Sequence, residues 1–560
     1  MSPVVPSAGP GSRPPNIVWI STHDINPDLG CYRGVWPTAT AAATPRLDAL
    51  AADGLRFDQA FATAPVCAPS RSSVMTGCFP TSIGTHAMRS KAVPPPDVRL
   101  LSEHFRQAGY YCTNASFTDF QVPVPGTAFD DCSPTAHWRG RTDPEQPFFA
   151  SFHGMTTHES QIYLDDAEFA ESTASLPPEQ RHDPEGIPVP PYHPDDDVFR
   201  TAWARYHDLI SVMDSWVGGI LDELAEDGLD RETIVVFWSD HGAGFPRAKR
   251  WATEAGLRVP LIIRWPGHVD GGRTRDDVVH LADLAPTMLR LAGLGIPGSM
   301  QTAPLLDVDG SDLAQGEYAF GGRDRMDEQQ DSSRTVRDRR YRYVRHRHPD
   351  RSPFQLQHFA EKFSTWKDLR SRVNDEARHR AAGLPPNSLT PLQRRVTAGS
   401  KPVEELYDLE ADPFETSNLA DDPAHRAELD RLRAALDDWI ERVGDLGTVD
   451  EEVLIARWRP DGRIPCTATP WAQADGDRIL LGCSDEGALL AWTPDPPCEE
   501  GAELSFQQLI SGDPEQDGRT WHICSTSLPV SEESRWVRAW RLGFHGSAEI
   551  ALPTRGAAIT

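Results

Sequence analysis

Three short apolar runs in the first half of the chain each end in a group of polar residues. The runs are rich in β-branched and aromatic residues and have the length of buried strands. Amphipathic helical patterns, of which 202–224 is the longest, lie between them. Strands that alternate with helices form a largely parallel sheet covered by helices on both faces, so we predict an α/β fold. The three runs are NIVWIST (16–22), FFASF (148–152) and TIVVFW (233–238).

The polar groups that follow these strands mark the expected functional edge of the sheet. They are His23-Asp24, the segment 153–158 and Asp240-His241. In sheets of this type, ligands bind outside the carboxyl ends of the strands. Because three separate strands deliver polar side chains to the same edge, we expect these residues to converge on one site.

The chain is too long for one simple core, and the pattern of strand and helix signals along it changes twice. We predict a disordered tail at 1–14 and a main α/β domain at 15–309. A smaller α+β subdomain is expected at 310–447, where the alternation at 334–345 resembles an exposed strand. Short strand patterns broken by Gly, Pro and Asp predict an appended β-sandwich at 453–555.

Charge and composition exclude several classes of partner. The formal net charge of -28 argues against nucleic acid and against an anionic membrane surface. The sequence contains no run of about 18 apolar residues, and its start lacks the pattern of a secretory signal. The nine cysteines are scattered without CxxC pairs, so most are expected to be reduced and buried. We therefore expect a cytoplasmic protein that binds neither nucleic acid nor membranes.

The segment that carries the chemistry runs from Cys67 to Gly77 and reads CAPSRSSVMTG. Its plain structural interpretation is a buried cysteine in a turn before a helix. The segment also resembles the signature of the type I sulfatases, in which the cysteine of C-x-P-S-R is oxidised to formylglycine. Further segments are similar to the same family, and the whole resemblance covers roughly residues 15–445. These segments are 16–33, 44–48, 239–242, 249–260 and 405–419.

The resemblance implies an alkaline-phosphatase-like fold, and the heparan N-sulfatase branch is the most similar. It also implies a mechanism that explains why Cys67 would have to be modified. A hydrated aldehyde carries two geminal hydroxyls, of which one attacks sulfur and the other later expels sulfate by re-forming the aldehyde. Neither a serine nor a cysteine can perform the second step.

The resemblance assigns the metal ligands to Asp24, Asp240, His241 and an oxygen of the modified Cys67. Carboxylate oxygens suit Ca²⁺ or Mg²⁺, whereas imidazole shifts the balance toward Mn²⁺; we expect Ca²⁺. His23 stands where the family often has a second aspartate, and it is either a further ligand or a residue that supports one. Asp240 alone would also be read as a helix N-cap.

For the remaining catalytic roles the resemblance points to Arg71, His158 and Lys249. Arg71 would orient the formylglycine, and the other two would contact the sulfate. Without the resemblance, Lys249 would be interpreted as a charged surface residue and His158 as a histidine in a loop. The sequence departs from the family near 114–119, where Phe117 replaces a lysine. Residues that could compensate or bind substrate are His86, His137 and Arg323, and the last also reads as part of a charged surface loop.

The resemblance predicts a sulfatase that hydrolyses a sulfate ester or sulfamate of a small or carbohydrate-like substrate. Its expected partners are that substrate and a formylglycine-generating maturation enzyme, and an oligomer is compatible with the sequence. Two alternatives remain open. The first is a phosphonate monoester or phosphodiester hydrolase of the same superfamily. The second, which the missing lysine suggests, is a catalytically weak member with a binding role.

Overall fold

A seven-stranded mixed sheet forms the centre of the computed structural model, which describes residues 13–39, 43–497 and 519–555. Most of the sheet is parallel, and β6 is antiparallel to both of its neighbours. The strands in spatial order are β3 (Tyr111–Asn114), β4 (Phe148–Gly154), β1 (Asn16–Thr22), β5 (Thr233–Ser239), β6 (Arg258–Arg264), β2 (Leu55–Phe61) and β7 (Arg273–His280).

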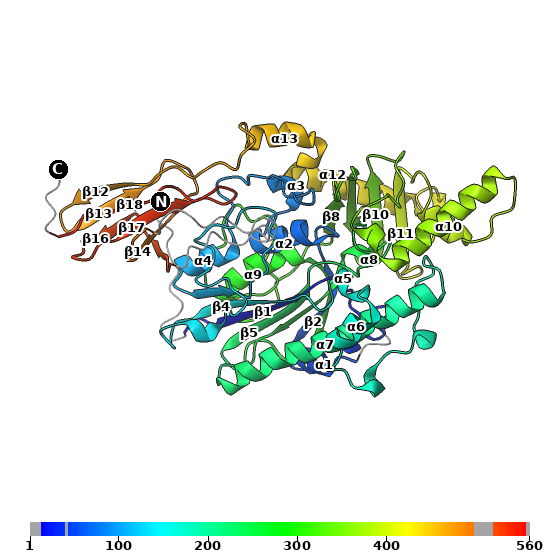
Figure 1. Cartoon of the computed structure of the whole chain (residues 1–560), viewed down its shortest axis with the longest axis horizontal. Helices are drawn as coiled ribbons and strands as arrows, with labels where there is room; N and C mark the ends of the chain where they lie inside the picture. Colours follow the sequence, from blue (N-terminus) through cyan, green and yellow to red (C-terminus); the bar gives the residue numbers. More distant parts are fainter. Residues whose placement is uncertain (1–12, 40–42, 498–518, 556–560) are drawn as a thin grey trace.

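Helices cover both faces of this sheet (Figure 1). One face packs against α2 (Cys67–Thr76), α4 (Leu101–Gln107) and α9 (Leu284–Leu291). The other packs against α1 (Pro45–Ala52) and the long α7 (Asp197–Glu226). Successive β1 residues alternate between the two cores, which explains why this strand is apolar at nearly every position. The predicted α/β class with a largely parallel central sheet is confirmed.

Strand β2 lies in a segment for which the sequence predicted no strand. The pattern predicts a helix that begins at Thr44 and stops near Gly54; α1 ends at Ala52, and β2 begins at Leu55. Gly54 occupies the junction, where a side chain would collide with the carbonyl oxygen of Ile263 on β6. The run LRFDQAF mixes polar and apolar residues because its polar side chains, such as Arg56 beside Asp58, form ion pairs at the surface of the sheet.

A second, antiparallel sheet follows in the order β11-β10-β9-β8 and packs against α12 (Arg426–Val443). The segment 334–345, interpreted above as an exposed strand, is instead a buried hairpin. Its arginines Arg334 and Arg342 are almost completely buried. Their burial is tolerated because each guanidinium pairs with a carboxylate: Arg334 with Asp445 and Arg342 with Glu254. The strands are β8 (Ala319–Arg323), β9 (Ser333–Arg337), β10 (Tyr341–His346) and β11 (Glu404–Asp408).

The C-terminal module contains two small antiparallel sheets that enclose a separate apolar core. It lies at one end of the molecule, away from the second sheet (Figure 1). The three-stranded sheet contains β12 (Trp471–Asp475), β13 (Arg478–Gly482) and β16 (Ser527–Pro529). The four-stranded sheet contains β15 (His522–Cys524), β14 (Leu489–Thr493), β17 (Trp536–Trp540) and β18 (Ile550–Ala551).

The other helices lie on the surface or link these parts. Of the predicted tail at 1–14, residues 1–12 lie outside the described residues. No helix in the described part of the chain combines the length and the hydrophobicity needed to cross a bilayer. The remaining α-helices are α3 (Pro80–Ile83), α5 (Glu159–Ile162), α6 (Asp166–Ser172), α8 (Glu254–Leu257), α10 (Ser364–Ala381), α11 (Pro391–Val396) and α13 (Glu451–Trp458).

Truncating the apolar face of α12 tests how much this packing stabilises the second sheet. Leu432 is fully buried against that sheet, so Leu432→Ala should lower the free energy of unfolding by about 2–5 kcal/mol. The midpoint of urea unfolding, followed by tryptophan fluorescence, measures the change. Glu441→Ala on the exposed face of the same helix is the control and should change stability by less than about 0.5 kcal/mol. Equal effects of the two substitutions would contradict this packing.

Candidate functional site

The parallel pairing of β1 with both β4 and β5 brings three strand ends to one place. Thr22 lies opposite Gly154 on one side and opposite Ser239 on the other. The chain then turns sharply at Asp24, whose φ of 54° is in the left-handed region that aspartate tolerates. This turn lets the backbone N–H of Asp24 donate to Asp240 Oδ1 at 3.1 Å. The predicted convergence of polar residues therefore exists in the structure.

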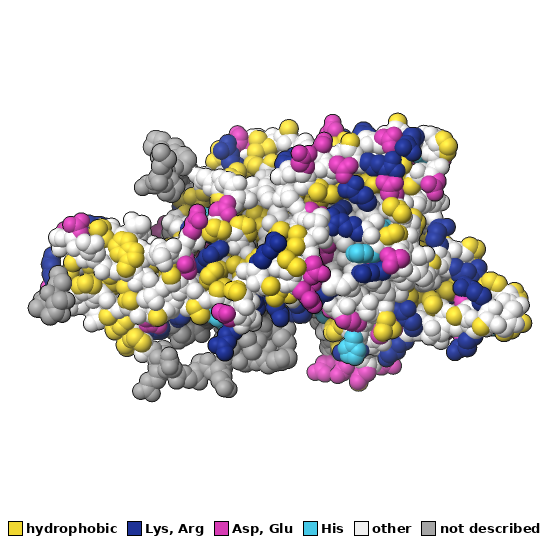
Figure 2. Space-filling model, turned by 90° about the horizontal axis from the view of Figure 1, so that it is seen from above, with side chains coloured by type: hydrophobic (Ala, Val, Ile, Leu, Met, Phe, Trp, Pro, Cys, Tyr) yellow, Lys and Arg dark blue, Asp and Glu magenta, His cyan; other side chains and the backbone are white. Residues whose placement is uncertain are grey.

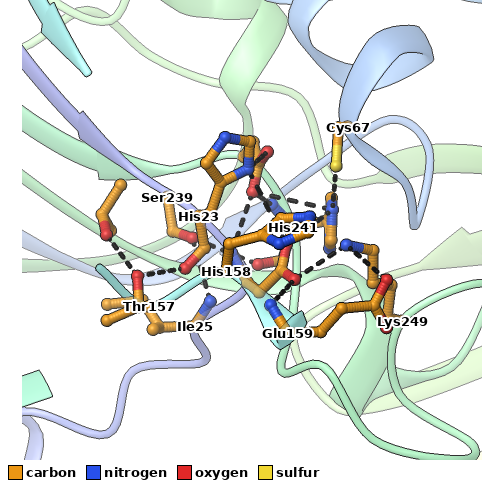
Figure 3. A network of polar contacts seen from close by, with 12 residues as sticks. His23, Ile25, Cys67, Thr157, His158, Glu159, Ser239, His241 and Lys249 are labelled. Carbon is orange, nitrogen blue, oxygen red and sulfur yellow. Dashed lines mark hydrogen bonds and ion pairs between the residues drawn. The ribbon is translucent and has the colours of Figure 1, made fainter. Parts of the chain in front are cut away.

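Cys67 is the first residue of α2, and its side chain points into this group of residues (Figure 3). Its Sγ lies 3.3 Å from His241 Nε2. The hydroxyl of Ser70, one turn later, donates to the backbone carbonyl of Asp240 at 2.6 Å and fixes the helix against the end of β5. Because the amino end of a helix carries partial positive charge, an anion beside residue 67 is stabilised there.

Four potential ligand atoms from His23, Asp24, Cys67 and Asp240 lie within 4.8 Å of one another. All four residues are buried. Within the described chain, Asp24 Oδ1 and His23 Nε2 have no hydrogen-bond partner. Buried polar atoms without partners are costly, and two carboxylates with nearby imidazoles form a donor set that suits a divalent cation. The residues present therefore fit a metal ion held by Asp24, Asp240 and the histidines beside them.

Lys249 compensates part of the negative charge of the group. Its Nζ lies 2.7 Å from Asp24 Oδ2 and 3.1 Å from Glu159 Oε1. Burial alone would raise the pKa of Asp24, but the charges of Lys249, His241 and other neighbours lower it overall. Burial would likewise lower the pKa of Lys249, yet the surrounding carboxylates raise it, so the lysine remains charged. The site thus keeps a fixed cation beside its carboxylates.

The thiol of Cys67 is a poor nucleophile in this environment. Burial raises the pKa of the thiol well above its ordinary range; the charge of Lys249 opposes this shift, and the charges of Asp240 and Asp24 add to it. Since the thiolate is the reactive form of cysteine, the unmodified side chain stays protonated and inert. The environment therefore favours a role for residue 67 in which its thiol is replaced by another group.

Two histidines at the rim of the group are neutral at physiological pH. Burial, with the charge of Lys249, lowers the pKa of His158 to about 4. Burial and the neighbouring Arg71 lower the pKa of His153 well below its usual range. Both rings lie edge-on to His23, with centroids 5.3 Å and 4.2 Å away, respectively. These rings can donate or accept a hydrogen bond without adding charge.

Arg71 organises the wall beside Cys67. Its guanidinium donates to the backbone carbonyls of Thr118 at 2.8 Å and Phe117 at 3.1 Å, and lies 2.8 Å from His153 Nδ1. The Phe117 ring stacks on His153 at 4.8 Å and lies 5.0 Å below the guanidinium carbon. A phenylalanine and a neutral histidine therefore form the wall at the position where the resemblance implies a lysine.

The structure places the three expected substrate-binding residues outside this group of contacts. His137 contacts Glu223 near the end of α7, and its ring lies tilted against Trp138 with the centroids 3.8 Å apart, so its role in substrate binding stays a prediction. Arg323 is not in a surface loop, because it ends strand β8 and its buried guanidinium pairs with Asp331, which precedes β9. His86 lines a separate cavity, described below. These placements depend on tertiary contacts that the sequence does not encode locally.

Three further residues, to which the sequence analysis gave no individual role, belong to the site. His153 is the next-to-last residue of β4 and lies in the segment 153–158, which was expected at this edge of the sheet. Glu159 donates its backbone N–H to Asp24 Oδ2 at 2.7 Å, and its carboxylate receives two hydrogen bonds from Arg250. Nothing in the spacing of an acidic and a basic residue 91 positions apart indicates this pairing.

The loop that presents Lys249 is held by residues that follow β11 of the second sheet. Arg247, with φ of 65°, donates to the carbonyls of Phe414 at 3.0 Å and Glu415 at 2.7 Å. The Glu415 carboxylate accepts the backbone N–H of Glu254 at 3.0 Å, on the far side of the same loop. Burial, opposed by the nearby Arg342 and Arg247, raises the pKa of Glu415 to about 7.

Comparison with known proteins identifies the family. The model described as sulfatase matches residues 15–132 and 139–294, and that described as N-sulphoglucosamine sulphohydrolase, C-terminal, matches 244–363. An ulvan-active sulfatase of Formosa agariphila is 33% identical over 581 positions, covering 96% of this chain and 91% of the relative. The chain belongs to the sulfatase family. Human N-sulphoglucosamine sulphohydrolase is 26% identical, with 76% of this chain and 90% of the relative covered.

Solved structures share the fold at low sequence identity. A phosphonate monoester hydrolase of Agrobacterium radiobacter superposes with a TM-score of 0.56 at 18% identity, covering 77% of this chain and 96% of that one. A protein solved with its substrate D-glucosamine-2-N,6-O-disulfate superposes with a TM-score of 0.54 at 17% sequence identity. This match covers 78% of this chain and 100% of that one. The predicted alkaline-phosphatase-like fold is thus confirmed.

Family membership confirms the predicted enzyme class, a sulfuric ester hydrolase. It implies a divalent metal and a formylglycine, and the buried group around Cys67 has the donors for that metal. The phosphonate or phosphodiester alternative is not favoured, because the relatives that match most of the chain in sequence are sulfatases.

The raised pKa of Glu415 predicts a pH-dependent stability. An ordinary glutamate titrates at about 4.3, so the folded state binds an extra proton between that pH and about 7. Its contribution to stability is therefore present at low pH and is lost as the pH rises to about 7. Glu415→Gln should flatten this decline, so that the variant gains stability relative to the parent from pH 5 to pH 8.

Urea unfolding midpoints at pH 5, 6, 7 and 8 test this prediction. Glu410→Gln, an exposed glutamate of the same loop, is the control and should leave the decline unchanged. Parallel curves for the parent and Glu415→Gln would show that the carboxyl does not titrate in this range.

Proposed function

We propose that this sulfatase removes sulfate from a sulfated saccharide through a formylglycine at position 67, with Ca²⁺ as its metal. The observation that supports this most directly is the buried group in which Cys67 Sγ lies within 4.8 Å of ligand atoms from His23, Asp24 and Asp240. In the modified protein, the aldehyde hydrate would occupy the position of that sulfur. It would supply one hydroxyl to attack sulfur and a second to release sulfate. A bound cation would neutralise the sulfate oxygens.

The side chains of this site would bind and orient the sulfate group. Lys249 keeps a positive charge beside Asp24, and the amino end of α2 adds its partial charge. His158, neutral at physiological pH, would donate a hydrogen bond to a sulfate oxygen without repelling the cation. Arg71 already donates to the carbonyls of the neighbouring wall, so its role would be to fix that wall and to oppose negative charge.

The proposed saccharide substrate rests on the relatives and on a nearby cavity. Relatives that match most of this chain are named for ulvan and for N-sulphoglucosamine. A polar cavity of about 710 Å³ lies between the two domains and α13, and His86 lines it with a buried Nδ1 that has no partner among the described atoms. Met88, two residues later, packs against Val66 and Ala68 on either side of Cys67. We propose that sugar units next to the reacting one bind there.

Conversion of Cys67 is the first experiment. The intact chain, co-expressed with a formylglycine-generating enzyme, should yield a Cys67 peptide with the mass of the aldehyde or its hydrate. The converted protein should release sulfate from sulfated oligosaccharides, and Cys67→Ala should reduce this to background. Lys249→Ala should reduce turnover roughly 10²–10³-fold while leaving conversion intact. Full conversion without release of sulfate from any ester or sulfamate would contradict the proposed function.

Metal binding can be tested without turnover. After treatment with a chelator, added Ca²⁺ should raise the melting temperature, since a ligand at 100 times its Kd stabilises by about 2.7 kcal/mol. Asp240→Asn should abolish this shift. Asp28→Asn is the matched control, because Asp28 is also buried but bonds to Tyr206 instead. The shift in melting temperature of His23→Ala on adding Ca²⁺ decides whether His23 binds the metal itself or supports a residue that does. Repeating the titration with Mn²⁺ or Mg²⁺ tests the choice of ion.

A further inference from the structure

The C-terminal module has an outer sheet face that the catalytic role does not explain. The alignment with the ulvan-active sulfatase covers 96% of this chain, and the remaining 4% is too short to contain the module. The module is therefore shared with a relative named for a polysaccharide. In Figure 2 the end of the molecule formed by this module carries fewer charged side chains than the opposite end.

Side chains of the three-stranded sheet alternate between the module core and solvent. Trp471 begins the outward series and is 51% exposed, which is unusual for so large an apolar side chain. The other large apolar side chains exposed in the described part of the chain belong to different segments. The outward residues are Trp471, Gln473, Asp475, Arg478, Leu480, Gly482, Ser527 and Pro529.

A glycine on the neighbouring strand holds the indole of Trp471 against the sheet. Trp471 pairs with Gly482 across the two strands. A Cβ built on Gly482 would lie 2.3 Å from one atom of the indole, so the ring occupies the space that any other residue would fill. The ring therefore packs one side on the glycine backbone and leaves the other side to solvent. This arrangement forms a rigid aromatic platform.

Polar groups with fixed positions lie on the same face. Arg478 donates to Ser527 Oγ at 3.1 Å and 2.6 Å, which orients its guanidinium across two strands. Gln473 lies two residues beyond Trp471 and points to the same side. The indole matches the C–H side of a sugar ring. The Gln473 amide, the Arg478 guanidinium and the Asp475 carboxylate opposite that arginine match hydroxyl groups at the edge of the ring.

From these contacts we propose that the face centred on Trp471 binds a pyranose unit of the sulfated polysaccharide that the catalytic domain acts on. The assignment of that polysaccharide rests on the proposed function. A protein partner fits this face less well, because protein interfaces are centred on clusters of large apolar side chains, and Trp471 is the one strongly exposed large apolar side chain in the described strands β12, β13 and β16. A second attachment to a polymer raises the local concentration of sulfate esters near the catalytic domain. It gives no such advantage with a small substrate.

Affinity electrophoresis of the intact chain in gels containing sulfated ulvan tests the proposal. Trp471→Ala should reduce the retardation, with a Kd at least about fivefold weaker, which corresponds to about 1 kcal/mol. Gly482→Val, which would push the indole off the sheet, should have the same effect. Phe359→Ala, a partly exposed aromatic of another segment, is the control and should be retarded like the parent. Circular dichroism establishes that each variant is folded.

Kinetics provide the second measurement. For converted enzyme, Trp471→Ala should raise KM on the polysaccharide about fivefold and leave kcat/KM on a small aryl sulfate unchanged. Parent protein without retardation, or a Trp471→Ala variant retarded as strongly as the parent, would overturn the proposal. The retardation requires no turnover and can be repeated with Cys67→Ala. Trp471-dependent retardation without sulfate release from any substrate would therefore refute the proposed function while leaving this face established.

Discussion

The in-register parallel pairing of β1 with β4 and β5 is the constraint on which the site depends. It brings Thr22, Gly154 and Ser239 to one level at the carboxyl edge of the sheet. The residues that follow these strand ends therefore lie close together, and the left-handed turn at Asp24 lets its backbone N–H donate to the Asp240 carboxylate. The hydrogen bond from Ser70 of helix α2 to the backbone carbonyl of Asp240 helps to place Cys67 among them.

Buried charge is tolerated here because each charged group has an opposite partner. Lys249 lies between Asp24 and Glu159, and Arg250 completes the pairing of Glu159. The same kind of pairing links the second sheet to the main α/β part, where Arg342 of β10 contacts both Glu254 and Glu415. Such networks cost desolvation energy, and removing one member leaves an uncompensated charge. The loop that carries Lys249 thus depends on residues of both domains.

Much of the fold could be predicted from local sequence, and the errors have physical causes. Strands β1 and β5 are continuous apolar runs, which two buried faces require. The hairpin at 334–345 was interpreted as an exposed strand because the carboxylates that neutralise its arginines lie far away in sequence, as Asp445 does for Arg334. Within the site, Asp24, Cys67 and Asp240 follow recognisable motifs. The contact of His137 with Glu223 could not be predicted, because only the tertiary fold brings the two residues together.

The burial of Cys67 has a consequence for how the protein is made. Residue Cys67 is 5% exposed in the folded chain and lies at the start of a buried helix, where burial raises the pKa of its thiol. The maturation enzyme that the proposed function requires would have to reach this residue before α2 packs on the edge of the sheet. Under that proposal, oxidation of Cys67 and folding of the main domain would compete in time. The fraction of active molecules would then follow the relative rates of these two events.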